Sequence, residues 1–292
     1  MDHRPILDLG LDGAHVAVTG GKGLIGRVVV DHFLAAGAIV SSLDITYSPD
    51  GASRSDSASS AFTSIHCDVA DEESVQQAFA TATKAHGPVD ICIALASLDL
   101  STLEPSAFAT ASFSQLQRVL GVNVAGTFLT AREWVRGLHD AKATGKTMKH
   151  PNLIIIGSES GHFGERRNVD YSLAKSAVQG GLLMSLRAEV PREWPGARVN
   201  VVAPGPVETE RWHEECRINP EQYYREAQAT TALGEPIPIR AVAMAILSLA
   251  SHNFSSHVHG QVINVDGGKQ GKLIYSRAEA AQVRHAGEPC DA

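Results

Sequence analysis

The amino-acid sequence predicts an α/β fold in which a mostly parallel, seven-stranded sheet carries helices on both faces. Two patterns lead to this expectation. Short apolar runs alternate with longer amphipathic runs along the whole chain, as in repeated β-α-β units. The short runs are also rich in β-branched residues, including Ile154, Ile155 and Ile156 in a row. Such runs suit strands that are buried on both faces.

Each element follows from its own stretch of sequence. The apolar runs that have the length of strands are residues 14–19, 39–43, 64–67, 89–95, 153–157, 198–202 and 261–265. The runs with helical periodicity are residues 23–36, about 71–86, 114–137, 171–190 and 239–251. Their alternation predicts the order of strands and helices in a doubly wound sheet.

Three segments interrupt this alternation. Residues 47–61 are rich in Ser, Gly, Asp and Ala, which is typical of a mobile surface loop. Residues 204–234 carry prolines, charges and three large aromatic residues, which suggests a lid or binding loop with a short helix. Residues 269–292 are expected to form a polar tail. Without a recognisable linker, residues 1–292 are expected to form one domain with its core at about 11–268.

Composition excludes several classes of protein. The chain has 292 residues and a formal net charge of −7, which disfavours nucleic acid or an anionic membrane as the main partner. No apolar stretch reaches the roughly 18 residues needed to cross a bilayer, and residues 1–10 do not resemble a signal peptide. A cytoplasmic location is therefore expected. Cys67, Cys92, Cys216 and Cys290 lack metal-ligand spacing, so no metal is expected, and Cys67 and Cys92 are interpreted as core residues.

A glycine-rich run follows the first expected strand and precedes the first expected helix. It reads Thr19-Gly20-Gly21-Lys22-Gly23-Leu24-Ile25-Gly26. Glycines let the backbone turn sharply and approach a pyrophosphate, which the N–H groups of the following helix can then bind. Glycines also occur in ordinary turns, but this position between strand and helix indicates a Rossmann-type dinucleotide site. The expected contacts are Thr19, Gly20, Gly23, Leu24, Ile25 and Gly26.

Two acidic residues extend the expected cofactor site. Asp44 ends the second strand, where a carboxylate accepts hydrogen bonds from the adenine ribose and repels a 2′-phosphate, so NAD(H) is favoured. Lys22 favours NADP(H) if it meets that phosphate, and otherwise it is a solvated loop lysine. Asp68 and Val69 follow the third strand. There they contact the adenine edge or, equally well, begin the helix that starts near residue 71.

Tyr171, Lys175, Ser158 and Asn123 are candidates for the chemistry. Tyr171 and Lys175 lie four residues apart and therefore share one helix face. A nearby ammonium, or an oxidised nicotinamide, lowers the pKa of a tyrosine and makes it a general acid/base near neutral pH. Ser158 ends a strand, where it holds the reacting oxygen or forms a turn. Asn123 is a poor mid-helix residue, which calls for a structural or catalytic reason.

Taken together, these motifs resemble those of the short-chain dehydrogenase/reductase family, in its compact single-domain branch. The resemblance covers about residues 11–268. Its motifs are the glycine run, Asp68-Val69, Asn123, Ser158, Tyr171-Ser-Leu-Ala-Lys175, Arg198-Val-Asn200, Pro204-Gly205 and Asp266-Gly267-Gly268.

The resemblance implies roles for these residues. Tyr171 would be the acid/base, Ser158 the anchor of the substrate oxygen, and Asn123 the residue that positions a water in the proton relay. Lys175 would bind the nicotinamide ribose and depress the Tyr171 pKa. The backbone near residues 204–207 would contact the nicotinamide amide, with contributions from Pro204, Gly205, Val207 and Thr209.

The family also implies an assembly. It pairs its two long central helices, here residues 114–137 and 171–190, across a two-fold axis, so a homotetramer or homodimer is expected. The residues that would permit close packing are Gly180, Gly181, Leu182, Leu183 and Leu186.

The sequence departs from the family pattern in two places. Its glycine spacing is more usual in the larger branch of the family. The fourth strand ends Ala94-Leu95-Ala96-Ser97, where the family usually has Asn-Asn-Ala-Gly. Those asparagines tie strands together and shape the cofactor cleft, so their replacement bears on the local geometry.

The function expected from the sequence is that of an NAD(H)-dependent oxidoreductase that interconverts a secondary alcohol and a ketone on a small molecule. Residues 160–167 and 208–224 should face the substrate. Their mix of aromatic and charged side chains favours a medium-sized polar or partly aromatic compound such as a secondary metabolite, unless they form only a solvated rim. Two alternatives remain. One is a redox-inert isomerase, dehydratase or cyclase. The other is a non-enzymatic dinucleotide-binding protein.

Overall fold

The computed structural model describes residues 7–49, 53–54, 61–276 and 278–279. Its central sheet has the strand order β10-β7-β6-β5-β1-β2-β4-β3. The strands are β1 (His15–Thr19), β2 (Ile39–Asp44), β3 (Ser53–Arg54), β4 (Phe62–His66), β5 (Ile91–Ala94), β6 (Asn152–Ile156), β7 (Arg198–Pro204) and β10 (Val262–Val265).

The seven parallel strands expected from the sequence are confirmed. Every neighbouring pair is parallel except β3 and β4, which are antiparallel. The short strand β3 lies inside the segment 47–61, which was expected to be a loop throughout. Residues 50–52 and 55–60 of that segment lie outside the described part of the chain.

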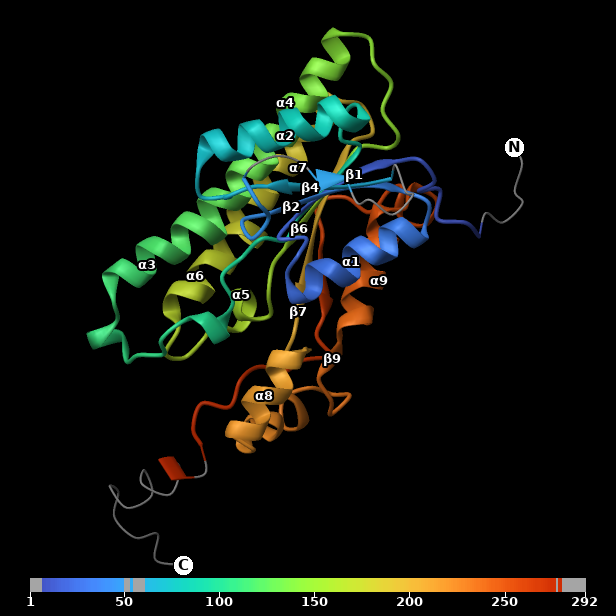
Figure 1. Ribbon diagram of the computed structural model, residues 1–292. Helices are drawn as coiled ribbons and strands as arrows, with labels where there is room; N and C mark the ends of the chain where they lie inside the picture. Colours follow the sequence, from blue (N-terminus) through green and yellow to red (C-terminus); the bar gives the residue numbers. More distant parts are fainter. Residues whose placement is uncertain (1–6, 50–52, 55–60, 277, 280–292) are drawn as a thin grey trace, which may run out of the picture.

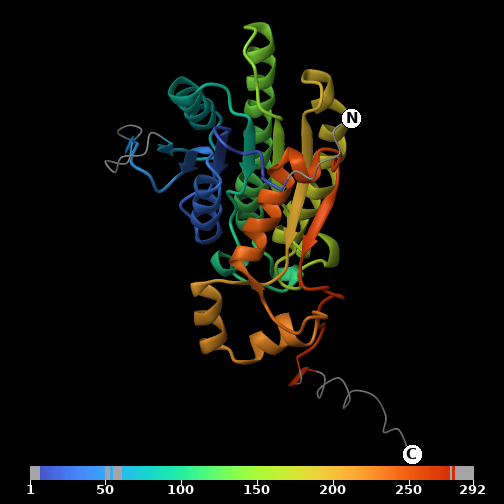
Figure 2. The same ribbon diagram turned by 90° about the vertical axis from the view of Figure 1, so that its right-hand side faces the viewer.

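Helices cover both faces of the sheet (Figures 1 and 2). The helices α1 (Leu24–Ala35) and α9 (Ile239–Ala250) pack together on one face, while α2 (Glu72–His86), α4 (Thr127–Ala143) and α7 (Leu183–Glu193) cover the other. Because successive strand residues point to opposite faces, Ile154 and Ile156 join the first core and Leu153 and Ile155 join the second. The apolar run in β6 is thus explained by burial on both sides.

The two long central helices are continuous but contain π-helical turns. The first runs through α3 (Phe113–Val119), η3 (Leu120–Gly126) and α4. The second runs through α6 (Val169–Ala177), η4 (Val178–Leu182) and α7. They end at Ala143 and Glu193, beyond the expected ends at 137 and 190. π-Helical turns are frequent at functional sites because they redirect side chains, and each turn here carries one buried amide side chain, Asn123 and Gln179.

The segment expected to be a lid, residues 204–234, is called the α8 segment below. It contains β8 (Val207–Glu208), α8 (Glu210–Ile218) and η5 (Tyr223–Gln228), and β8 pairs with β9 (Ile237–Pro238). The expected short helix is therefore present. The segment lies at the end of the molecule toward which the residues after β10 also run (Figures 1 and 2). The shorter helices are η1 (Leu100–Thr102), η2 (Phe108–Thr110), α5 (Ser160–Phe163) and α10 (His252–Ser255).

The structure also bears on the expectations about cysteines, membrane spans and metal sites. Cys67 and Cys92 are buried in the core, as interpreted, whereas Cys290 lies outside the described residues. Within the described chain, none of the helices is both long and apolar enough to pass through a membrane. The same residues contain no group of three or more His, Cys, Asp or Glu side chains that could hold a metal ion.

The expected polar tail begins at Lys269, which is only 5% exposed. Its ammonium lies close to the carboxylates of Glu159 and of Glu226, which is in the α8 segment. Residues 269–276, 278 and 279, called the C-terminal segment below, continue along this side. Residues 280–292 lie outside the description.

His15, the first residue of β1, is buried and contacts three other segments. The backbone N–H of His15 donates to Asp90 Oδ2 at 2.9 Å, its Nε2 lies 2.9 Å from Ser41 Oγ, and its Nδ1 lies 3.0 Å from the carbonyl oxygen of Gly87. Burial lowers the pKa of His15 from 6.5 to about 4. The folded protein therefore holds this imidazole neutral at pH values where the unfolded chain protonates it.

This difference makes folding stability depend on pH. Between pH 6.5 and about 4 the unfolded chain binds a proton that the folded chain does not, so stability falls as the pH falls through this window. From pH 7 to pH 5, wild type should lose about 2 kcal/mol more unfolding free energy than His15→Gln, which cannot titrate. Denaturant titrations of both proteins at the two pH values measure the difference. Equal losses would show that His15 does not control this pH dependence.

Candidate active site

A cavity of about 810 Å³ opens at the carboxyl ends of the parallel strands. Residues that directly follow β1, β2, β4, β5, β6 and β7 line it, and the α8 segment faces them. The strand order reverses at β1, which lies between β2 and β5. In open α/β sheets this switch point is where ligands bind.

The glycine loop forms one wall of the cavity. A Cβ at Gly26 would lie 2.0 Å from the carbonyl oxygen of Gly20, and a Cβ at Gly20 would lie 2.8 Å from Ala96 Cα, so neither position accepts a side chain. Helix α1 then begins at Leu24 without a side-chain cap or an acidic residue in its first turn. These uncapped N–H groups fit a pyrophosphate. Gly20, Gly23, Leu24 and Ile25 line the cavity.

Asp44 lies at the edge of this wall and is 8% exposed. Its Oδ2 accepts from the backbone N–H of Lys22 at 3.0 Å. Its Oδ1 accepts from the backbone N–H and the hydroxyl of Thr46 at 2.9 and 2.8 Å. The Lys22 ammonium donates to the carbonyl oxygen of Thr46 and lies over the Tyr47 ring. Lys22 thus contacts the loop after β2, but it remains exposed to solvent, and its role toward a 2′-phosphate stays a prediction.

The two alternatives for Asp68 and Val69 are separated by the geometry. Asp71, not Asp68, caps α2 by accepting from the backbone N–H of Glu73. The Asp68 carboxylate accepts from the backbone N–H of Ala70 at 2.9 Å. Asp68 and Val69 both line the cavity, where a ligand can reach them.

The altered end of the fourth strand is held by other side chains. Thr19 Oγ1 accepts from the backbone N–H groups of Leu95 and Ala96 at 3.1 and 3.3 Å. Asn123 Oδ1 accepts from the backbone N–H of Leu98 at 2.8 Å, and its Nδ2 donates to the Leu98 carbonyl oxygen at 3.0 Å. This pair of bonds gives the mid-helix asparagine a structural reason. Asn123 is 1% exposed, and it supports the cavity wall from behind.

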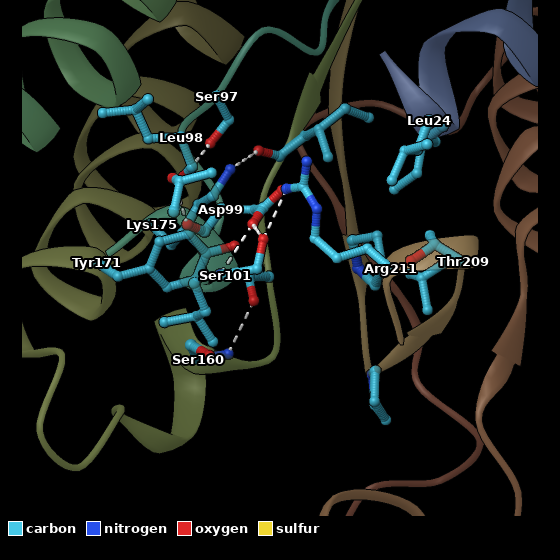
Figure 3. A pocket seen from close by; sticks show the side chains of 18 of the residues that line it. Leu24, Ser97, Leu98, Asp99, Ser101, Ser160, Tyr171, Lys175, Thr209 and Arg211 are labelled. Atoms are coloured by element: carbon cyan, nitrogen blue, oxygen red, sulfur yellow. Dashed lines mark hydrogen bonds and ion pairs between the residues drawn. The ribbon is translucent and has the colours of Figure 1, made fainter. Parts of the chain in front are cut away.

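Ser158, Tyr171 and Lys175 all line the cavity, and Figure 3 shows Tyr171 and Lys175 close together. Ser158 follows β6, and its backbone N–H donates to Gln179 Oε1 at 3.0 Å. Its side chain lies near enough to Tyr171 to lower the pKa of the phenol. The Lys175 ammonium lies 5.6 Å from the centre of the Tyr171 ring and donates to the carbonyl oxygen of Ile156 at 3.0 Å.

Burial controls the pKa values of Tyr171 and Lys175. It raises the pKa of Tyr171 to about 12, although the Ser158 side chain acts in the opposite direction. Burial also lowers the pKa of Lys175 to about 8. In the protein without cofactor the Tyr171 pKa is therefore shifted upward, because desolvation outweighs the contacts that favour the phenolate, and the effect expected of Lys175 stays a prediction.

The α8 segment closes the opposite side. Pro204, Gly205, Val207 and Thr209 line the cavity, as expected of residues near a nicotinamide. Thr209 also has a structural task, because its hydroxyl accepts from the backbone N–H of Trp212 and caps α8.

An ion pair reaches across the cavity from α8. Figure 3 shows Arg211 reaching toward Asp99 and Ser101. Its guanidinium lies 2.9 Å from Asp99 Oδ2 and 2.6 Å from Ser101 Oγ.

Several lining residues were missed by the sequence analysis. They are Leu98, Asp99, Ser101, Glu159, Arg225, Glu226 and Lys272. They come from separate segments and share no motif, so no local pattern marks them. The expected rims, residues 160–167 and 208–224, contribute Ser160, Glu165, Arg166, Thr209, Arg211 and Trp212 among others.

Comparison with known proteins finds relatives among reductases. A family profile described as enoyl-(acyl carrier protein) reductase matches residues 21–270. The 3-oxoacyl-[acyl-carrier-protein] reductase MabA of Mycobacterium tuberculosis is 28% identical over 87% of this chain and 91% of its own length. The acetoacetyl-CoA reductase of Synechocystis is 29% identical over 90% and 98%. The carbonyl reductase family member 4 of Danio rerio is 31% identical over 70% and 76%.

Solved structures share the fold. The crystal structure of gox2181 superposes with a TM-score of 0.73 at 26% identity, covering 89% of this chain and 96% of that one. A short-chain dehydrogenase/reductase from Brucella melitensis superposes with a TM-score of 0.69 at 22% identity, covering 90% and 98%. The second match concerns the fold alone.

Proposed function

Because the chain belongs to the short-chain dehydrogenase/reductase family, whose members act on carbonyl or CH–OH groups with NAD(P)(H), we propose that it interconverts a secondary alcohol and a ketone with NAD(H). The observation that carries this proposal is the convergence of Ser158, Tyr171 and Lys175 in one cavity beside the glycine loop. The whole chain would work as one dinucleotide-binding domain, in the cytoplasm.

The residues of the cavity divide into a cofactor side and a substrate side. Gly20, Gly23, Leu24 and Ile25 would hold the pyrophosphate, with Thr19 and Gly26 setting the shape of the loop. Asp44, Asp68 and Val69 would meet the adenosine, and Pro204, Gly205, Val207 and Thr209 the nicotinamide. When bound, NAD(H) supplies or accepts the hydride.

The remaining chemistry is proton transfer by the chain itself. The Tyr171 hydroxyl would give its proton to the carbonyl oxygen during reduction and take it back during oxidation, while Ser158 holds that oxygen. A pKa of about 12 keeps Tyr171 protonated near neutral pH, so the proton is present for reduction, but it leaves little phenolate to accept a proton during oxidation. The positive charge of a bound oxidised nicotinamide would offset this. Lys175 would bind the nicotinamide ribose. Asn123 would hold the backbone of Leu98 in place, in the cavity wall beside the proton relay.

A small-molecule ketone of medium size and mixed polarity is the proposed substrate. Apolar Leu98 and Trp212 and charged Asp99 and Arg211 all line the cavity, which supports such a compound, including a secondary metabolite. Two relatives are named as reductases of 3-oxoacyl-[acyl-carrier-protein] and acetoacetyl-CoA, both of which contain a ketone.

We propose a homotetramer or homodimer as the assembly. Phe128, Leu173 and Met184 expose 49%, 51% and 44% of their surface on α4, α6 and α7, where a second copy would cover them. Gly180 and Gly181 have open space where a side chain would stand. Leu182 and Leu186 are partly buried beside them, but Leu183 is fully buried in the core and cannot contribute to an interface.

Turnover of Tyr171→Phe tests the chemistry. The ring and its packing survive, so only the proton carrier is lost, and kcat should fall by roughly 10²- to 10⁴-fold. NADH binding, followed by its fluorescence, should stay near wild type. Lys175→Ala should lower kcat and also weaken NADH binding. If Tyr171→Phe keeps more than about a tenth of wild-type turnover, the proton comes from another group and the assignment gives way to a redox-inert one.

Asp44→Ser tests the cofactor preference. The wild type should bind NADH more tightly than NADPH, since the Asp44 carboxylate would face the 2′-phosphate, and the variant should relax this preference. Fluorescence titrations with both cofactors measure it. A wild type that prefers NADPH by roughly tenfold or more would reverse the proposal and assign the 2′-phosphate to Lys22.

Light scattering tests the assembly. At micromolar concentration the mass should be two or four times 31.0 kDa, the mass of one chain. Leu173→Glu should shift the mass toward one chain, because it places a charge in the apolar contact. A wild type that elutes as a single chain contradicts the proposal.

A further inference from the structure

A cluster of buried charges joins the C-terminal segment to the active site. The Lys272 ammonium lies 2.5 Å from Glu165 Oε2, 3.0 Å from Glu159 Oε1 and 3.5 Å from Glu226 Oε2. Glu159 directly follows Ser158, Glu165 precedes α6, and Glu226 lies in η5 of the α8 segment. One side chain thus contacts three elements that border the cavity.

A second lysine completes the cluster. The Lys269 side chain is fully buried, and its ammonium donates to the carbonyl oxygen of Glu226 at 2.6 Å. It also lies 3.4 Å from Glu159 Oε2 and 3.6 Å from Glu226 Oε2. Burying charges costs desolvation energy that ion pairing often fails to recover, so the presence of such a cluster is weak evidence for a purely stabilising role.

A chain of hydrogen bonds runs from this cluster to the reacting groups. Ser160 Oγ donates to Glu165 Oε2 at 2.8 Å, on the same oxygen that Lys272 contacts. The backbone N–H of Ser160 donates to Ser158 Oγ at 3.2 Å. Ser160 is 1% exposed, so water does not compete for these bonds.

We propose that Lys272 is a positioning residue of the active site. It sets the orientation of the Ser158 hydroxyl through Glu165 and Ser160, and through Glu226 it holds the α8 segment to residues 158–165, the segment that contains Ser158. This inference rests on the proposed function, in which Ser158 anchors the substrate oxygen. Through Lys272, the C-terminal segment would help to position the reacting groups.

The charges of the cluster also act on Tyr171. Glu165 raises the Tyr171 pKa, whereas Lys272 lowers it. Lys272 therefore offsets a carboxylate that the loop places near the acid/base. Without this ammonium, the unbalanced carboxylates would hold the tyrosine proton more firmly.

A separate contact anchors the C-terminal segment and supplies a control. Arg166 pairs with Glu279 at 2.9 Å and donates to the carbonyl oxygen of Ile274 at 2.6 Å. These contacts do not involve the Lys272 cluster. Glu279→Gln thus removes a charge from the same segment while leaving the cluster intact, and its kcat should stay within about twofold of wild type.

Steady-state kinetics of Lys272→Met test the proposal. Small errors in the position of reacting groups are costly, so kcat should fall roughly 10- to 100-fold. The KM for NADH should stay within about threefold, since the cluster does not touch the cofactor side. The rising limb of the pH profile for alcohol oxidation should move to higher pH, because Tyr171 loses a compensating charge. Lys272→Arg, which keeps the charge, should recover most of kcat.

Ser160→Ala provides a second test that leaves every charge paired. It removes only the bond to Glu165, so the fold should survive, and kcat should fall in the same direction as in Lys272→Met but by less. In the double variant the losses should be less than multiplicative, because both changes break one chain of contacts. Circular dichroism and thermal unfolding of every variant establish that the folded protein is being compared.

The outcomes separate this inference from the proposed function. If Tyr171→Phe is inactive but folded Lys272→Met keeps kcat within about twofold of wild type, Lys272 positions nothing and the inference fails alone. A kcat loss with an unchanged pH profile, no recovery in Lys272→Arg and fully multiplicative losses would also overturn it. If Tyr171→Phe remains active, the proposed function itself fails.

Discussion

The sheet is buried on both faces, and this constraint determines where chemistry is possible. Every residue of β6 is buried, and its backbone groups are paired with β5 and β7. Polar side chains inside such a sheet would have to find partners in an apolar core. They are therefore tolerated best where strands end, and Thr19, Asp44 and Ser158 all stand at or just after the carboxyl end of a strand. The cavity exists because these ends meet at the switch point of the strand order.

Buried amides and hydroxyls then hold the strand ends together. Thr19 binds the backbone after β5, Asn123 binds Leu98, and Gln179 binds the backbone of Ser158. Asn123 and Gln179 both come from π-helical turns within the long central helices. Gln179 also fills the space beside Gly157 and Gly161, where a Cβ would lie within 2.6 Å of its amide. Where the family usually has asparagines at the end of β5, Thr19 and Asn123 supply hydrogen bonds to the backbone of residues 95, 96 and 98.

Local patterns were enough to predict much of this arrangement. The parallel sheet, the glycine loop and the Tyr171–Lys175 pair depend on neighbouring residues or on a single helix face, so spacing reveals them. The Lys272 cluster could not be predicted, because Glu159, Glu226 and Lys272 are far apart in the sequence and meet only after folding. The upward shift of the Tyr171 pKa in the cofactor-free protein was not foreseen, for a related reason. Desolvation depends on everything packed around the phenol, whereas the spacing of Tyr171 and Lys175 describes one neighbour only.

Asp44 shows how one carboxylate can be both structural and selective in the proposed function. It already accepts three hydrogen bonds. The donors are the backbone N–H groups of Lys22 and Thr46 and the Thr46 hydroxyl. A ribose hydroxyl would use its remaining lone pairs or replace the Thr46 hydroxyl, so the gain in binding from that hydrogen bond would be modest. Repulsion of a 2′-phosphate needs no free lone pair, because it acts through the whole charge. The expected preference for NAD(H) would therefore come more from excluding the phosphate than from attracting the ribose.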